Sequence, residues 1–240
     1  MKKQFIILIL AFSNLMFSQI KFGAKGGLNL TDASVGVNIK GTFMEENIVV
    51  NSGGSGQGTT SQTTRNFNET FYVATSTKFS YYIGAFAEYP INKKGNLALK
   101  TELLYCQNGT TVNKKTMPEN EDIYYTTNGG SIAVGQINIP LMLKYSSPKK
   151  LAFLAGIYAG TTLFAKSTSS QGLTKTENFN AFDFGLNFGA SYPINKNWAL
   201  DVRYNHGLLN IDKARESDNF ITIQSLYYNR SFYFGLEYLF

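Results

Sequence analysis

The segment A-F-D-F-G-L-N-F-G-A-S-Y, residues 181–192, alternates apolar with small or polar side chains over its whole length. Apolar residues occupy every even position from Phe182 to Tyr192, whereas the odd positions hold Asp, Gly, Asn, Gly and Ser. Successive side chains of a β-strand point to opposite faces, so this alternation predicts a strand with one apolar and one polar face.

Seven other segments repeat the pattern, with 151–160 the least polarised. They are residues 20–30, 79–89, 97–106, 136–145, 151–160, 198–205 and 231–240. Short connections at 90–96, 146–150 and 193–197 alternate with long polar ones at 31–77, 107–131, 165–178 and 208–222. In the longest connection, the flanks 36–43 and 67–75 retain β character and could prolong the neighbouring strands. The pattern predicts an all-β fold: an eight-stranded antiparallel up-and-down barrel with short turns at one end and long loops at the other.

Alternation alone does not say which face meets water. A soluble ligand-binding barrel buries its apolar face, whereas a transmembrane barrel turns that face to lipid and keeps polar residues in its lumen. The polar faces here are rich in Gly, Asn and Ser, and the chain ends on an aromatic residue within its last strand. Aromatic residues also recur at the short-turn end of the apolar faces, as in a membrane-interface girdle. We therefore predict a transmembrane barrel whose interface aromatics are Phe22, Tyr89, Tyr145, Tyr192, Trp198 and Tyr238.

The inward faces carry five cations and five anions by the same parity. They are Lys21, Lys25, Lys100, Lys144, Arg203, Glu88, Glu102, Asp183, Asp201 and Glu237. Eight strands leave a lumen that side chains can fill, and isolated buried charges are costly. We predict a paired lumen charge network, with Glu88 near Lys100 and Glu237 near Lys21 or Lys25. A lumen that conducts small solutes is the alternative.

The first 18 residues have the layout of a signal peptide, with Lys2 and Lys3 followed by a short apolar run. We expect residues 1–18 to be a signal peptide and residues 19–240 to form one outer-membrane β-barrel domain. The single Cys106 excludes an internal disulfide. The net charge of +6 is too small to indicate nucleic-acid binding. The single His206 lacks a spaced nucleophile or metal-ligand cluster, so we expect no catalytic site, no metal and no cofactor.

Two motifs carry a resemblance to a known family: Q-I-N-I-P-L-M-L-K-Y at residues 136–145 and F-G-L-E-Y-L-F at 234–240. The mature chain resembles the small outer-membrane β-barrel family of Gram-negative bacteria, which is porin-like and of the PorT type. The resemblance implies an outer-membrane location. It also implies biogenesis by periplasmic chaperones and the barrel-assembly machinery, with Leu236, Tyr238 and Phe240 as the assembly signal.

The resemblance says little about activity. We expect a monomer that contacts outer-membrane lipid and serves as a non-catalytic envelope or surface-interaction protein. Its partner would be an extracellular ligand or another envelope protein, bound by the long loops. The alternatives are a narrow channel for small solutes and an accessory component of a protein secretion system.

Overall fold

The computed structural model describes residues 20–49, 59–113, 115–120, 123–127, 129–169, 171–172, 174–176, 179–213, 215–217 and 220–240. The predicted signal peptide lies outside these residues. No helix in the described part of the chain is long and apolar enough to cross a membrane.

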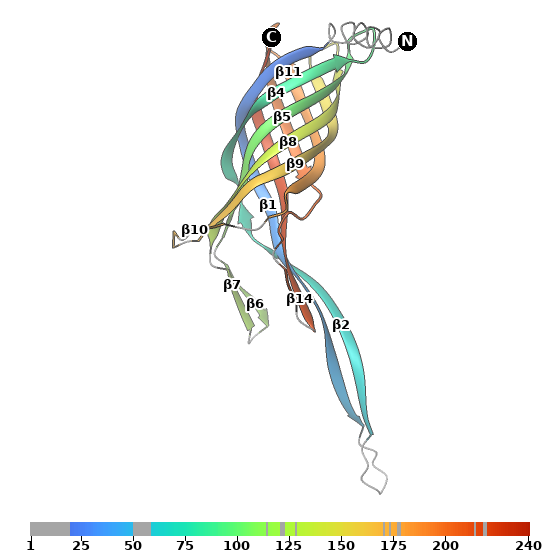
Figure 1. Cartoon of the computed structure of the whole chain (residues 1–240), viewed down its shortest axis with the longest axis vertical. Coiled ribbons are helices and arrows are strands. Elements are labelled where there is room, and N and C mark those ends of the chain that lie inside the picture. Colours follow the sequence, from blue (N-terminus) through green and yellow to red (C-terminus); the bar gives the residue numbers. More distant parts are fainter. Residues whose placement is uncertain are drawn as a thin grey trace, which may run out of the picture.

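Within the described residues, eight antiparallel strands form a closed barrel (Figure 1). They are β1 (Lys21–Val49), β4 (Lys78–Pro90), β5 (Leu97–Val112), β8 (Gly130–Ser146), β9 (Ala152–Ser169), β11 (Phe182–Pro193), β12 (Trp198–Gly207) and β14 (Ile221–Leu239). Each strand pairs with its neighbours along the chain, and β14 closes the ring by pairing with β1 from Gly23↔Leu239 to Gly41↔Ile221. The predicted eight-stranded up-and-down barrel is confirmed. Closure matters because it leaves no open strand edge in the ring.

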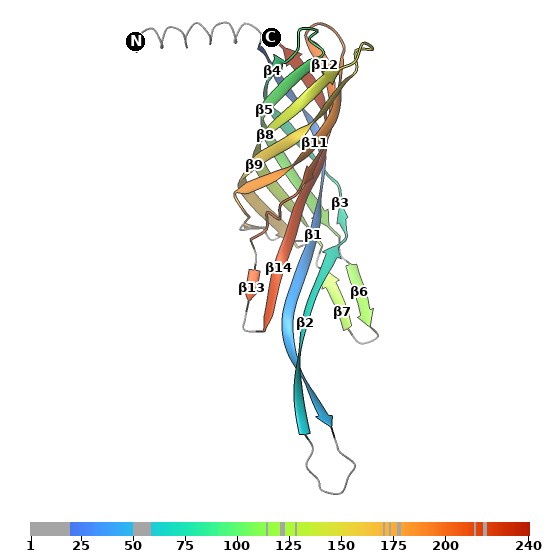
Figure 2. The same ribbon diagram turned by 90° about the vertical axis from the view of Figure 1, so that its right-hand side faces the viewer.

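The strands run far beyond the alternating segments, into residues that were predicted to be loops. β1 continues to Val49 and pairs with β2 (Thr59–Val73), and β14 starts at Ile221. Shorter strands join this end: β3 (Thr75–Ser76) pairs with β5, β10 (Thr174–Thr176) with β9, and β13 (Arg215–Ser217) with β14. β6 (Lys115–Asn120) and β7 (Ile123–Thr127) form a separate hairpin. In Figure 2, β1 and β2 project away from the barrel, at the end opposite to the C-terminus.

Polar side chains link the two strands of this extension, which lies in a connection that was predicted to be a long polar loop. The Asn38 amide donates hydrogen bonds to Thr70 Oγ1 at 2.7 Å and Asn68 Oδ1 at 3.0 Å, and Thr42 Oγ1 donates to Asn66 Oδ1 at 2.8 Å. The β character of 36–43 and 67–75 is therefore confirmed. However, the second flank pairs with β1 as part of β2 and does not continue β4.

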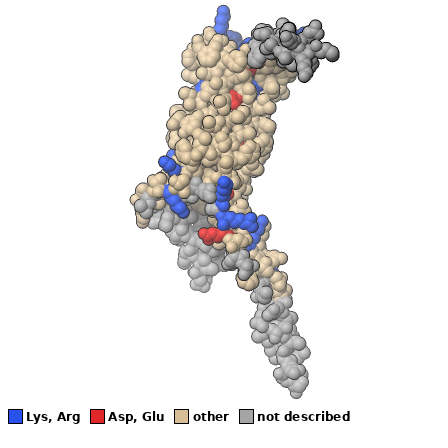
Figure 3. Space-filling view, in the orientation of Figure 1, with Lys and Arg blue, Asp and Glu red and all other residues tan. Residues whose placement is uncertain are grey.

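The apolar face of the barrel points outward. Leu28, Phe79 and Ile83 are 60%, 76% and 61% exposed, whereas the neighbouring Asn29 and Ser80 are buried. Figure 3 shows a wall of mostly uncharged surface between charged residues near its two ends. A water-soluble barrel would bury such a continuous apolar band, whereas lipid covers it at no cost.

Candidate functional site: the lumen and its flanking layers

The lumen holds a compact network of ion pairs centred on Lys25 of β1. Its Nζ lies 2.8 Å from Asp201 Oδ1 on β12, 3.1 Å from Glu237 Oε1 on β14 and 3.3 Å from Glu102 Oε1 on β5. All four side chains are buried. A single ammonium thus links β1 to β5, β12 and β14.

Arg203 of β12 makes the most directional contacts in this network. Its Nη2 and Nη1 lie 2.6 Å and 2.7 Å from the two carboxylate oxygens of Glu102, a bidentate arrangement. Its Nε donates to Asp201 Oδ2 at 3.0 Å. The strand period of two explains this geometry, because residues 201 and 203 both point inward from the same strand.

The network continues toward the short turns through Lys100 and Lys144. Lys100 Nζ lies 2.5 Å from Glu237 Oε1 and 3.2 Å from Glu88 Oε1, and Lys144 Nζ lies 2.6 Å from the same Glu88 oxygen. Four cations and four anions therefore take part, and their formal charges sum to zero. This balance compensates much of the cost of removing the charges from water.

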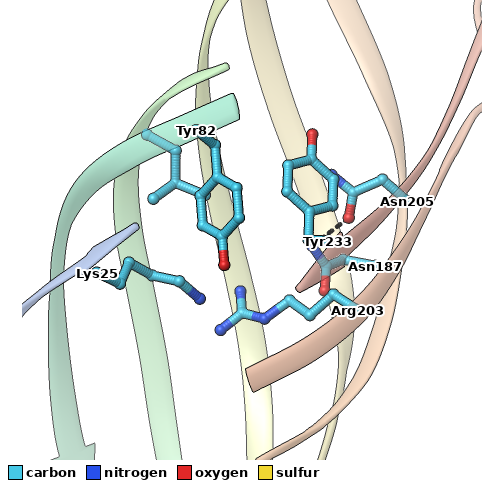
Figure 4. Close-up of a pocket in the computed structure, with 7 residues that line it drawn as sticks. Lys25, Tyr82, Asn187, Arg203, Asn205 and Tyr233 are labelled. Carbon is cyan, nitrogen blue, oxygen red and sulfur yellow. Dashed lines mark hydrogen bonds between the residues drawn. The ribbon is translucent and has the colours of Figure 1, made fainter. Parts of the chain in front are cut away.

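An aromatic layer covers the ion pairs on the side of the long loops. The rings of Tyr82 and Tyr233 meet edge to face with centroids 4.9 Å apart, and Lys25 Nζ lies 5.7 Å from the Tyr82 ring. Figure 4 shows these side chains gathered around one small pocket with Arg203, Asn187 and Asn205. The gap between them is too small to hold a water molecule.

Two of the ten predicted charges lie outside this network. Lys21 is the first residue of β1 and is exposed where the barrel opens to solvent. Asp183 is buried, but on β11 it lies eight residues from Ser191, the residue that pairs with Asp201. That separation is about 27 Å along the strand. The alternation along each strand placed both residues on the inward face, but it could not give their position along the barrel axis.

Asp183 belongs instead to a layer of amides near the loop end. Its Oδ2 accepts hydrogen bonds from Asn229 at 2.7 Å, Gln136 at 3.2 Å and the Tyr158 hydroxyl at 3.3 Å. Asn108 donates to Gln136 Oε1 at 2.6 Å. Uncharged donors thus bind one oxygen of this carboxylate, where the prediction expected a cation, while its Oδ1 is buried without a hydrogen-bond partner.

The predicted girdle residues all lie on the outer wall near the short turns. Trp198 and Tyr238 pack with centroids 4.9 Å apart, and Phe240 meets Tyr238 edge to face at 5.7 Å. Leu236 is exposed on the same face. Phe22, Tyr145 and Tyr192 are exposed there, and Tyr89 is half-buried. This level of the wall therefore presents aromatic rings to its surroundings.

A second aromatic layer lies at the loop end, and the sequence interpretation missed it. Tyr204 and Phe232 pack with centroids 4.7 Å apart, and Tyr81 and Tyr105 with centroids 6.1 Å apart. Its aromatic residues could have been found at the loop end of the same alternating segments. Two girdles on one wall are the arrangement of a membrane-spanning barrel.

No group of three or more His, Cys, Asp or Glu side chains within the described ranges could hold a metal ion. His206 lies on the outer wall, where its Nδ1 is 3.0 Å from the Tyr204 hydroxyl. It is therefore remote from the buried carboxylates of the lumen.

Comparison with known proteins agrees with this architecture. Residues 12–213 match a family model described as an outer membrane protein beta-barrel domain. The chain belongs to this family. It is an outer-membrane β-barrel of a Gram-negative bacterium. The narrower assignment to PorT-type members stays a prediction. No curated protein matches the chain.

Solved barrels of this kind resemble the chain only remotely. Neisserial surface protein A is 13% identical with a TM-score of 0.48, covering 91% of this chain and 97% of its own. OprG from Pseudomonas aeruginosa is 12% identical with a TM-score of 0.42, covering 92% and 95%. Ail of Yersinia pestis, solved with the heparin analogue sucrose octasulfate, is 9% identical with a TM-score of 0.42, covering 92% and 99%. Similarity at this level carries no information on activity or ligands.

Proposed function

We propose that this protein is a non-catalytic, non-conducting outer-membrane barrel that holds a strand ribbon outside the cell to bind a surface or envelope partner. The ribbon is defined as β2 together with residues 35–49 of β1. The observation that carries the proposal is the buried ion-pair network: four cations and four anions are cross-linked below an aromatic layer, and the gap lined by this layer leaves no space for water.

The charge balance of the lumen supports the non-conducting role. A solute passing Lys25 and Arg203 would have to separate contacts of 2.6–3.3 Å between buried groups. Breaking buried ion pairs is costly because each freed charge stays in a poorly solvating environment. The barrel wall is then a rigid support and not a pore.

The form of the ribbon supports a binding role. β1 and β2 pair without interruption from Val35↔Val73 to Val49↔Thr59, and β1 is the sole strand that pairs with β2 in the described residues. The outer edge of β2 therefore offers backbone donors and acceptors to a further strand. Tyr72, near the base of the ribbon, is 57% exposed and adds an aromatic contact. A paired ribbon loses less conformational entropy on binding than a flexible loop.

The non-catalytic role rests on the position of the single histidine. Nucleophilic catalysis by Ser or Cys usually needs a base beside the nucleophile, most often His. His206 stands on the outer wall, opposite Arg230 in the strand register.

Conductance in planar bilayers tests the lumen half of the proposal. Residues 19–240, refolded in detergent and shown to insert, should give a flat trace. The double variant Glu102→Ala with Arg203→Ala removes the bidentate pair and should open measurable steps. Regular steps from the unaltered protein would refute the non-conducting barrel and make a narrow channel the better assignment.

Photo-crosslinking on intact cells tests the ribbon half. A crosslinking residue at Thr64 of β2 should give a discrete adduct with a protein or glycan, whereas one at Thr101 on the barrel wall should label lipid. Absence of any discrete adduct from Thr64, with the barrel assembled, would contradict a partner on the ribbon.

A further inference from the structure

Three strands form a small grid on the outer wall, just beyond the apolar band at the loop end. The last apolar row consists of Tyr204, Phe232 and Leu30, which are register partners across β12, β14 and β1. The next outward-facing row consists of His206, Arg230 and Asp32, paired in the same way. Arg230 is therefore the first cation that β14 presents above its lipid-facing residues.

Arg230 is poorly paired within the protein. Its nearest carboxylate oxygen, Asp32 Oδ2, lies 3.9 Å from Nη2, which is too long for a hydrogen bond. The other oxygen of Asp32 accepts hydrogen bonds from the Ala33 amide at 2.7 Å and the Thr110 hydroxyl at 3.0 Å. The Nε of Arg230 is buried and has no partner. The Arg230 side chain is nevertheless 37% exposed, so its terminal Nη atoms can reach an external acceptor.

Clefts flank Arg230 on both sides. One, of about 260 Å³, is lined by Arg230 together with His206, Leu208, Tyr228 and Ser34. The other, of about 190 Å³, is lined by Leu30, Tyr204 and Phe232 together with Asp32 and Thr77, and it opens onto the apolar row. Two clefts, each lined by both polar and apolar groups, thus meet at a single arginine.

We propose that these clefts bind a phosphate-bearing lipid of the outer leaflet. Its phosphate would occupy the cleft between Arg230 and His206, and one acyl chain would lie over Leu30 and Phe232. Arg is the side chain best suited to phosphate because its planar guanidinium donates two parallel hydrogen bonds.

The position of the site favours lipid over a soluble anion. In outer-membrane barrels the long loops face the cell exterior and the short turns face the periplasm. The row containing Arg230 therefore stands at the level of the outer-leaflet headgroups, directly above the band that meets acyl chains. This assignment goes beyond the proposed ribbon function, and neither depends on the other.

Binding of dioctanoyl phosphatidic acid, measured by native mass spectrometry in a phosphate-free maltoside detergent, tests the proposal. The unaltered protein should retain this lipid and should not retain dioctanoylglycerol, which lacks the phosphate. Arg230→Gln should weaken binding about tenfold, equivalent to about 1.4 kcal/mol. His206→Gln should weaken it less.

Arg215→Gln, on the exposed strand β13, is the matched control and should leave the affinity unchanged. Resistance of each barrel to SDS before boiling confirms that it is folded. Equal affinity of the Arg230→Gln variant and the unaltered protein would overturn the site. Full displacement of the lipid by millimolar inorganic phosphate would also overturn it, because the site would then be one for free anions.

Discussion

Replacing Glu102 by Gln removes one negative charge from the centre of the lumen without changing the size of the side chain. Glu102 accepts both guanidinium hydrogen bonds of Arg203, at 2.6 Å and 2.7 Å, and lies 3.3 Å from Lys25 Nζ. After the change, four cations face three anions in the network. One amide hydrogen-bond donor would also point at the donors of Arg203.

The expected loss of stability is about 3–5 kcal/mol, the range found when one member of a buried ion pair is removed. A single contact at 4 Å with an effective dielectric constant of 20 already amounts to about 4 kcal/mol. The side chain of Glu102 is fully buried, so water cannot replace the lost contacts.

Equilibrium unfolding in urea measures this loss, with the protein refolded in detergent. The single Trp198, 43% exposed on the outer wall, reports on folding by its fluorescence. The midpoint should fall, whereas the slope with denaturant should stay unchanged because the same surface is exposed on unfolding.

The double variant Glu102→Leu with Arg203→Met separates charge imbalance from simple loss of contacts. It leaves three cations and three anions, and it should recover at least half of the stability lost in the single variant. A loss below about 1 kcal/mol in Glu102→Gln would show that the network does not hold the lumen together. If the stability lost in the double variant equalled the sum of the losses in its two single variants, the argument from charge balance would be refuted.

Other predictions concern the wall, the lumen and the C-terminus. Leu141→Arg, on the lipid-facing wall, should lower the free energy of unfolding by about 2–4 kcal/mol, whereas Thr64→Arg on exposed β2 should leave it almost unchanged. Equal folding yields of the two variants in lipid vesicles would show that the inner and outer faces of the barrel are assigned the wrong way round. Gly235→Val should lower the free energy of unfolding by about 1–3 kcal/mol, because a Cβ there would lie 2.2 Å from the Tyr82 hydroxyl. An unchanged midpoint of urea unfolding would contradict this expectation. Deletion of Phe240 should slow assembly in cells, measured by pulse-chase, and should leave refolding in detergent unchanged, measured by gel shift. Equal assembly rates of the deletion variant and the unaltered protein in cells would argue against an assembly signal.

Period-two alternation was enough to predict the barrel and its strand number, and the interface aromatics together with the composition of the polar faces added which face meets lipid. Each of these properties depends on side-chain direction, and direction along a strand follows directly from sequence position. The pairing of Glu88 with Lys100 also followed from the sequence, because a short turn fixes the register of its two strands. In contrast, the β character of residues 36–43 and 67–75 did not show that these two segments pair with each other, or in which register.

The sequence by itself determined which residues face the lumen, because parity is a local property of each strand. Only the tertiary structure decided which of them meet. The height of a residue depends on the stagger between strands, and stagger is fixed by closing the ring through β14 and β1. For that reason Lys25 and Arg203 share their carboxylates near the short turns, while Asp183 is held by amides at the other end. The row of His206, Arg230 and Asp32 has the same origin, since β1, at the other end of the chain, becomes the neighbour of β14 only when the barrel closes.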